Sequence, residues 1–473
     1  MSRIHRRTFL QGALGAAGAA ATFHISSDKA GARILGANER LRIAVCGMNG
    51  RGRSHYNSYK NTDGVEVSWV VDPDRRKLRG ADNTTTDVRE ALDDKNLDAI
   101  SVATPNHWHS MMVILAAKAG KHCFVEKPAS HDIHEGRVAL EAWKKYGVVV
   151  QHGTQQRSSQ GRANMIKAIQ SGKYGKLAVS HGFCCKPRAG IGHREPGPPP
   201  EWLDWNLWRG PAVLDQFHAN LVHYNWHWFW PTGNGDLNNQ GTHQLDVAFW
   251  ALEPGLTAPI RAMAVGGRFA WDDQGETPNT MFALAEYPNG QKVFFNVRNV
   301  NYDGYQRQVK NDFHFEDGGK IIGDTYISPT GERESVEGES AEITSGGNFG
   351  SFINACRAGK PEMSNCDMEV AHYSCLLGHV MNNSYRLGKK VPFNEKAGRF
   401  GDDKMAYEEF MKVHEIMRDG VGIPEDGAEY TVGPWLTFDP ETERFTGEHA
   451  DEANTLLRDP RREEFDIPAP DQV

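Results

Sequence analysis

The feature that most constrains the fold is a short apolar segment, residues 41–46, that runs directly into a glycine-rich turn. The apolar run predicts a buried strand. The turn reads Gly47, Met48, Asn49, Gly50, Arg51, Gly52. Set against the pattern G-x-G-x-x-G, Gly47 and Gly52 take the first and third glycine positions, and Asn49 takes the second. Asparagine tolerates a left-handed backbone, although its side chain could crowd a pyrophosphate. The junction predicts a nucleotide-binding loop that opens an α/β domain.

A second predicted strand, residues 65–71, ends in Asp72, which stands 20 residues after Gly52. A dinucleotide-binding fold places at this distance the acid that binds the ribose 2′-hydroxyl. A carboxylate there repels a 2′-phosphate, which favours NAD over NADP, whereas Arg75 and Arg76 nearby weaken that preference. The alternative interpretation of Asp72 is a helix N-cap or turn residue.

Strands and helices keep alternating up to residue 151. Strands are predicted at 98–103, 122–125 and 148–151, with helices at 108–119 and 133–146. This order predicts a doubly wound parallel sheet, in which ligands bind at the carboxyl ends of the strands. Polar clusters stand at two of those ends: Thr104, Pro105, Asn106 and His109 at one, and Glu126, Lys127 and Pro128 at the other. We expect these residues to contact the cofactor.

After residue 151 the pattern changes to that of an α+β domain with a mostly antiparallel sheet. Strands are predicted at 177–183, 281–287, 292–298 and 312–315, with hairpin turns at 288–290 and 317–319. Gln156 and Arg157 lie near the expected cleft between the domains, and we assign Gln156 to the cofactor and Arg157 to the substrate. The expected divisions are an N-terminal segment (1–37), a nucleotide-binding domain (38–155), a substrate domain (156–395) and a C-terminal extension (396–473).

An aromatic stretch, residues 224–230, is the candidate substrate surface of the second domain. Tyr224, Trp226, His227 and Trp228 alternate rings with polar groups, which suits the CH faces and hydroxyls of a sugar. The alternative is that these rings pack in the core or in a subunit interface. Nearby histidines lack a carboxylate or cysteine at ligand spacing, so we expect no metal site.

The first residues have the layout of an export signal. A twin-arginine pair, Arg6 and Arg7, precedes a weakly apolar stretch rich in Ala and Gly, which indicates the twin-arginine route and a periplasmic location. The alternative is a disordered basic N-terminus. The net charge of −8 disfavours nucleic acid as a partner. No apolar run reaches the ~18–20 residues of a membrane span.

Taken together, the glycine loop, Thr104-Pro105-Asn106 with His109, and Glu126-Lys127-Pro128 resemble the Gfo/Idh/MocA family of oxidoreductases. Residues 241–246 resemble the family's helix over the nicotinamide, and the long tail is similar to that of exported bacterial members. The resemblance implies that Lys127 assists proton transfer at the reacting carbon. Burial would depress its pKa toward neutrality. The alternative is a lysine that only pairs with Glu126.

The resemblance also implies a catalytic histidine at His243, with an aspartate four residues earlier, where this chain has Asn239. A spacing of four residues would place both on one helical face. Asparagine cannot act as a base, so the catalytic candidates are Lys127, His243 and Asn239, with Asp236 either replacing the missing acid or capping the helix.

These observations predict an enzyme that moves a hydride between a sugar, cyclitol or glycoside carbon and tightly bound NAD. Two alternatives stay open: a redox-neutral glycosidase that oxidises, eliminates and reduces, and a non-enzymatic sugar-binding protein. The family resemblance adds an expected homodimer or homotetramer.

Overall fold

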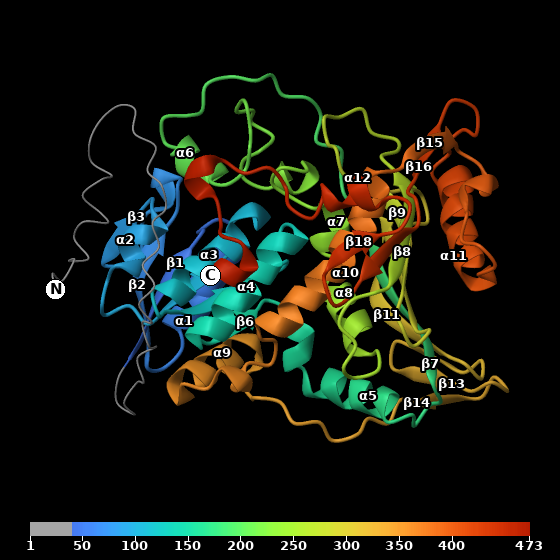
Figure 1. Cartoon of the computed structure of the whole chain (residues 1–473), viewed down its shortest axis with the longest axis horizontal. Helices are drawn as coiled ribbons and strands as arrows, with labels where there is room; N and C mark the ends of the chain where they lie inside the picture. Colours follow the sequence, from blue (N-terminus) through green and yellow to red (C-terminus); the bar gives the residue numbers. More distant parts are fainter. Residues whose placement is uncertain (1–39) are drawn as a thin grey trace.

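The computed structural model describes residues 40–473, so the twin-arginine segment expected at 1–37 lies outside the described residues. Two sheets form the frame, and helix α10 lies between them (Figure 1). The first sheet has the order β3-β2-β1-β4-β5-β6, and every pairing in it is parallel. The doubly wound N-terminal domain is therefore confirmed.

The elements of this first sheet follow the predicted alternation. Its strands are β1 (Leu41–Cys46), β2 (Val65–Val71), β3 (Asn83–Thr85), β4 (Ala99–Val102), β5 (His122–Val125) and β6 (Val150–His152). Its helices are α1 (Arg51–Lys60), α2 (Val88–Leu92), α3 (His109–Lys118) and α4 (Ile133–Tyr146). Side chains of β1 alternate between two buried clusters: Leu41, Ile43 and Val45 face one, and Ala44 and Cys46 face the other. A strand buried on both faces reads as a continuous apolar run, which is why β1, β2 and β5 have their predicted bounds.

The second sheet has twelve strands in the order β14-β13-β12-β11-β7-β10-β9-β8-β16-β15, with β17 and β18 attached beside β8. Its strands are β7 (Leu177–Cys185), β8 (Arg261–Gly267), β9 (Thr280–Glu286), β10 (Lys292–Arg298), β11 (Gln308–Phe315), β12 (Lys320–Ile322), β13 (Thr325–Ile327), β14 (Arg333–Ser335), β15 (Lys389–Pro392), β16 (Glu429–Val432), β17 (Leu436–Asp439) and β18 (Arg444–Thr446). Only β7 and β10 pair in parallel. The mostly antiparallel second sheet is thus confirmed.

Helices cover both faces of the second sheet. The remaining helices are α5 (Gln160–Gln170), α6 (Trp205–Arg209), α7 (Gly235–Asn238), α8 (Thr242–Trp250), α9 (Gly347–Ala358), α10 (Met368–Arg386), α11 (Lys404–Glu415) and α12 (Ala450–Asn454). α5, α8 and α10 pack in one apolar cluster, whereas α11 supplies Phe410 and Val413 to the cluster on the opposite face. α9 returns to the first domain, where Phe352 packs behind β1.

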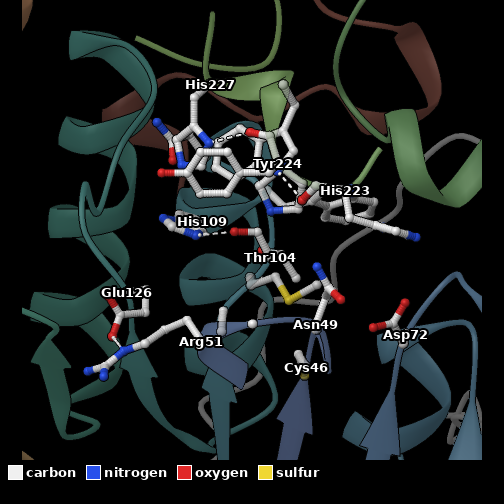
Figure 2. Close-up of a pocket in the computed structure, with 18 of the residues that line it drawn as sticks. Cys46, Asn49, Arg51, Asp72, Thr104, His109, Glu126, His223, Tyr224 and His227 are labelled. Carbon is white, nitrogen blue, oxygen red and sulfur yellow. Dashed lines mark hydrogen bonds and ion pairs between the residues drawn. The ribbon is translucent and has the colours of Figure 1, made fainter. Parts of the chain in front are cut away.

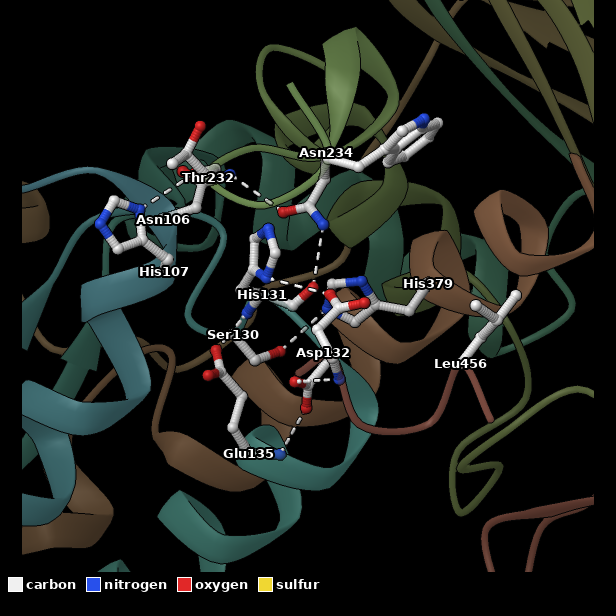
Figure 3. A network of polar contacts seen from close by, with 12 residues as sticks. Asn106, His107, Ser130, His131, Asp132, Glu135, Thr232, Asn234, His379 and Leu456 are labelled. Atoms are coloured by element: carbon white, nitrogen blue, oxygen red, sulfur yellow. Dashed lines mark hydrogen bonds and ion pairs between the residues drawn. The ribbon is translucent and has the colours of Figure 1, made fainter. Parts of the chain in front are cut away.

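The C-terminal segment crosses back to the first domain after β18. Phe465, Ile467 and Val473 are buried in the cluster that holds α3 and α4. A buried polar network stabilises this packing of the C-terminal segment. The ring of His131 contacts Asp459 at 3.2 Å. The backbone carbonyl of His131 accepts a hydrogen bond from Asn234 (Figure 3). The end of the chain therefore helps to hold the two sheets in a fixed relation.

Candidate functional site

A cavity of about 500 Å³ opens at the carboxyl ends of the first sheet, where the second domain faces them. Its volume is in the range of small-molecule and cofactor sites. The predicted residues that line it are Gly47, Asn49, Gly50, Arg51, Asp72, Thr104, Pro105, Asn106, His109, Glu126, Lys127, Tyr224, Trp226, His227, Asn239 and His243. Gly52, Pro128, Gln156, Arg157, Trp228 and Asp236 were also predicted, but they are not among its lining residues.

The glycine loop packs tightly against backbone atoms of the loop itself and of Ala103. A Cβ at Gly52 would lie 1.5 Å from the carbonyl oxygen of Gly47, and a Cβ at Gly47 would lie 2.7 Å from that of Ala103. Gly50, in contrast, faces open space, and as N-cap of α1 it offers no side-chain hydrogen bond. The first N–H groups of α1 thus keep no side-chain cap, as suits an anion.

Asp72 fastens this loop to the end of β2. Its carboxylate accepts from the backbone N–H of Met48 at 2.7 Å and from that of Asp74 at 2.8 Å. The N-cap interpretation is wrong, because Asp74 caps the short helix that follows. The bond from Asp74, two residues on, fits the other alternative, a turn residue. Burial raises the pKa of Asp72 to about 6. In Figure 2 it lies across the loop from Glu126.

The two arginines after β2, Arg75 and Arg76, form their contacts outside the cavity. Arg76 binds Asp74 and stacks on Trp202, with its guanidinium carbon 3.4 Å from the ring centroid. Arg75 lies 3.6 Å from Asp204. Neither lines the cavity, which removes the sequence's one argument for a 2′-phosphate.

Glu126 directly follows β5 and has two basic partners. Its Oε1 accepts from Arg51 Nε at 2.6 Å, and His55 Nε2 lies 3.1 Å from the same oxygen. Burial alone would raise the pKa of Glu126, but the His55 contact and the charges of Arg51 and Lys127 hold it well below its usual range. Glu126 is therefore ionised and pairs with Arg51, so the interpretation in which Lys127 only serves as its partner has no support.

The cluster after β4 is held by backbone carbonyls. The His109 ring lies between the carbonyl oxygens of Thr104 at 2.8 Å and Pro128 at 2.5 Å. Asn106 donates to Asn234, the residue that also reaches His131 (Figure 3). Thr104 lines the cavity, and its buried hydroxyl has no hydrogen-bond partner within residues 40–473. An orphaned buried hydroxyl is one that a ligand could satisfy.

Lys127 points from β5 to the second domain. Its Nζ donates to the backbone carbonyl of Asn239 at 2.9 Å and to Oδ1 of the same residue at 3.2 Å. No carboxylate pairs with it among the described residues. Burial lowers the pKa of Lys127, while the nearby carboxylates of Glu126 and Asp236 act in the opposite direction.

One expectation about the neighbouring helix is wrong. Asn239 and His243 do not share a helical face, because α7 ends at Asn238 and α8 begins at Thr242. The backbone turns sharply between them, with Gly241 so close to Leu237 that a Cβ would lie 2.1 Å from its carbonyl oxygen. His243 still lines the cavity, and burial together with the charge of Lys127 lowers its pKa to about 3, so it is neutral.

Asp236 is not a helix cap, since Asn234 and Gly241 are the caps, and it does not line the cavity. It is buried in a two-pronged ion pair with Arg188, at 2.8 Å for each contact. Burial would raise the pKa of Asp236, but Arg188 lowers it below its usual range. Asn239 links this pair to Lys127 by donating to Asp236 at 3.0 Å.

The aromatic stretch divides between cavity and core. Tyr224 is 49% exposed at the rim, and Trp226 stacks on His227 with ring centroids 3.5 Å apart. Trp228 is buried away from the cavity, which fits the core interpretation for that ring.

Two further residues assigned to the site lie elsewhere. Arg157 is buried against Asp246 at 2.8 Å, and Gln156 lies outside the cavity lining near Arg162. Neither residue lines the cavity in which we predicted it to bind substrate or cofactor.

Sequence reasoning missed several lining residues: Gln155, Lys186, Arg188, His223 and Gln240. The signal for two of them was available, because Lys186 and Arg188 directly follow the strand β7 as basic residues at a strand end. His55 was also missed, since its contact with Glu126 depends on packing of α1 beneath the sheet.

The residues present fit a dinucleotide. The uncapped start of α1 suits a pyrophosphate, Asp72 suits a ribose hydroxyl, and Thr104 offers its orphaned hydroxyl. Within residues 40–473 no cluster of His, Cys, Asp or Glu could hold a metal ion, and no helix there is long and apolar enough to cross a bilayer.

Comparisons with known proteins agree with this geometry. The family profile "Oxidoreductase family, NAD-binding Rossmann fold" matches residues 41–154, and "Oxidoreductase family, C-terminal alpha/beta domain" matches residues 166–420. Both carry the family label GFO_IDH_MocA. These matches span well over half of the chain.

Individual relatives match over shorter stretches. A myo-inositol 2-dehydrogenase of Thermotoga maritima is 30% identical over 181 residues, 37% of this chain and 51% of that protein. A glycosyl hydrolase family 109 protein of Shewanella baltica is 28% identical, over 28% of this chain and 36% of that protein. The chain thus matches about half, or less, of the length of these relatives. The structure of a levoglucosan dehydrogenase with NADH and levoglucosan aligns over 72% of this chain and 96% of that one, with 17% identity and a TM-score of 0.55.

Proposed function

Because the chain belongs to the Gfo/Idh/MocA oxidoreductase family, we propose that it moves a hydride between a hydroxyl-bearing carbon of a sugar, cyclitol or glycoside and NAD. Bound NAD supplies the hydride acceptor. The observation that carries the proposal is the position of Lys127. It lies in the same cavity as the glycine loop, and its Nζ donates to two oxygens of Asn239, its hydrogen-bond partners within residues 40–473.

Lys127 is suited to hold and release the hydroxyl proton. Its pKa is lowered by burial, so a larger share of the amine is neutral near neutral pH than for an exposed lysine. A neutral amine within hydrogen-bond reach of a carbinol can take its proton as the hydride leaves. Asn239 orients the Lys127 amine, because its backbone carbonyl and its side-chain oxygen both accept hydrogen bonds from Nζ.

His243 orients the substrate in this proposal. Its ring is neutral, so it can accept from one hydroxyl or donate to another. Tyr224, Trp226 and His227 add the rings that cover the apolar face of a sugar.

The test begins with purified full-length protein, denatured without added nucleotide, in which the released NAD(H) is counted per chain. Sugars, inositols and their methyl glycosides are then offered with NAD, and NADH is followed by absorbance. Near-stoichiometric nucleotide and NADH formation with a polyol are the expected results. A protein that neither carries nor binds nucleotide would contradict the proposal.

A second candidate is a redox-neutral glycosidase, which the similarity to a glycosyl hydrolase family 109 protein favours. In that cycle oxidation of a ring hydroxyl acidifies the adjacent C–H, elimination breaks the glycosidic bond, and the hydride returns. Release of a reducing sugar from a glycoside without net NADH identifies it. Net NADH from a free polyol identifies the dehydrogenase.

We further propose export by the twin-arginine route and a retained cofactor, on the ground of Arg6, Arg7 and the small residues that follow. No exchangeable NAD pool serves an exported enzyme, so the nucleotide would stay bound through each cycle. Replacing both arginines by lysine should keep a tagged protein out of the periplasmic fraction. We also propose a homodimer or homotetramer, which light scattering after gel filtration tests.

A further inference from the structure

The charged residues that line the cavity divide by domain. Those from the first domain have both signs: Arg51 and Lys127 stand with Asp72, Asp87 and Glu126. Those from the second domain are Lys186 and Arg188, both basic. The half of the cavity beside His243 and Gln240 therefore presents cations without a carboxylate from its own lining.

Lys186 is the less neutralised of the two. It follows directly on β7 and is partly buried, and its Nζ donates to the side-chain oxygen of Gln240 at 3.4 Å. No ion pair involves it within residues 40–473. Burial and the charges of Arg188 and Arg307 lower the pKa of Lys186, while the Asp236 carboxylate acts in the opposite direction. An ammonium has three N–H donors, so Lys186 keeps donors for an anionic ligand.

Arg188 is fixed beside it. Asp236 takes two of its N–H donors and the Tyr224 hydroxyl takes a third at 2.8 Å, which leaves two of the five guanidinium N–H groups. The side chain cannot swing away, because the buried Asp236 also accepts from Asn239 and Asn299. The cavity thus has one ammonium and one oriented guanidinium edge that can meet separate oxygens.

These cations are not needed for the cofactor's pyrophosphate. The pyrophosphate site suggested by the structure is the start of α1, where Arg51 already stands. Lys186 lines the cavity together with Gln240 and His243, in the part formed by the second domain. We therefore assign an anion that meets Lys186 to the substrate.

We propose that Lys186 and Arg188 bind a carboxylate of the substrate, so that the enzyme acts on an acidic sugar, a uronic acid or a uronoside. The proposal rests on the proposed function and names the substrate class of the same site. The ammonium of Lys186 and the guanidinium edge of Arg188 can each donate to one oxygen of a carboxylate.

The experiment compares sugars that differ only at C6. D-galacturonate is set against D-galactose, and D-glucuronate against D-glucose, on the full chain loaded with NADH for calorimetric binding and with NAD for turnover. We expect at least one uronate to bind about ten- to a hundredfold more tightly than its neutral partner, the gain of a charge-assisted contact. This preference should shrink as salt is raised.

Variants assign the preference to a residue. Lys186→Gln should lower the uronate-to-neutral ratio of kcat/KM about tenfold, and Lys186→Arg should restore most of it. The matched control is Lys173→Gln, a lysine paired with Glu337 at 3.0 Å, which should leave the ratio unchanged.

The outcomes separate the two levels of inference. Three results would overturn the acidic-sugar proposal: both uronates bind no more tightly than their neutral partners, sugar phosphates or sulfates bind more tightly than uronates, or Lys186→Gln leaves the kcat/KM ratio unchanged. NADH formation from neutral polyols would still support the proposed function. Absence of nucleotide binding overturns the proposed function. In that case calorimetry with the uronates alone still decides whether Lys186 binds a carboxylate.

Discussion

The cofactor end of the cavity is made from the strand ends of one parallel sheet, whereas the substrate end is made from a loop-rich stretch held by one buried ion pair. At the first end, backbone geometry fixes Gly47, Gly52 and Asp72. At the second, Asp236 and Arg188 fix the side chains around them. The comparison teaches that one end is specified by strand order and spacing, and the other by long-range contacts.

The largest effect is expected at Lys127, which lies between the cofactor end and the substrate end of the cavity. Lys127→Met should lower kcat by about 10²–10⁴-fold, the contribution of a positioned acid–base group. NADH affinity should change little, because the glycine loop and Asp72 are untouched. Steady-state kinetics and NADH titration measure both. Lys144→Met, on an exposed lysine that pairs with Glu369 at 3.4 Å, is the control. Equal losses of kcat and nucleotide affinity would make Lys127 a cofactor ligand instead.

The next largest effect concerns the ion pair of the substrate end. Asp236→Asn leaves the mostly buried guanidinium of Arg188 unpaired and should lower the free energy of unfolding by about 3–5 kcal/mol. Urea unfolding measures it. Removing both charges, with Arg188→Met and Asp236→Asn together, should recover part of that loss. Asp272→Asn, on a fully exposed side chain, should change it by less than about 0.5 kcal/mol. A single variant as stable as the parent would refute the structural role of this pair.

The sequence was informative where function depends on local backbone. The strand at residues 41–46, the turn that follows and the acid at position 72 are neighbours in one supersecondary unit, so spacing alone places them. The helix at 133–146 and the strands at 65–71, 122–125 and 292–298 have the predicted bounds, because each is marked by a local pattern of apolar residues.

It was less informative where side chains from distant segments meet. The break between α7 and α8 separates Asn239 from His243, and no periodicity in a nine-residue window reveals it. Likewise the pairing of Asp236 with Arg188 joins residues 48 positions apart. Arg157 looked like a cleft residue because it is charged and follows β6, but its partner Asp246 lies on α8.

A smaller effect tests the cofactor end. Asp72→Asn should weaken NAD binding about 10–100-fold at pH 8, because a charged acceptor for a ribose hydroxyl is lost. Since the pKa of Asp72 is about 6, NAD affinity of the parent is full above pH 6 and falls as the pH drops through 6, approaching tenfold per unit. The variant should lack this dependence. Calorimetric titration across that range measures it, with Asp82→Asn, an exposed acid, as control. A parent with pH-independent affinity would show that Asp72 does not contact the nucleotide.

The smallest effect probes the link between the two ends, Asn239. Asn239→Asp would place a carboxylate 3.2 Å from Lys127 Nζ and raise the pKa of that lysine. Because Lys127 must be neutral to take a proton, the rising limb of the kcat–pH profile should move to higher pH, by about one unit. The shift stays modest because the new acid also lies 3.0 Å from Asp236, whose negative charge keeps it partly protonated.

The control for this last change is Asn239→Ala, which removes the amide oxygen without adding charge. It should lower kcat because the Lys127 amine is less well oriented, and it should not shift the rising limb of the kcat–pH profile to higher pH. If Asn239→Asp leaves the limb in place, Lys127 is not the group that titrates, and the proton must leave by way of His243. The direction of the shift therefore decides which end of the cavity carries the proton.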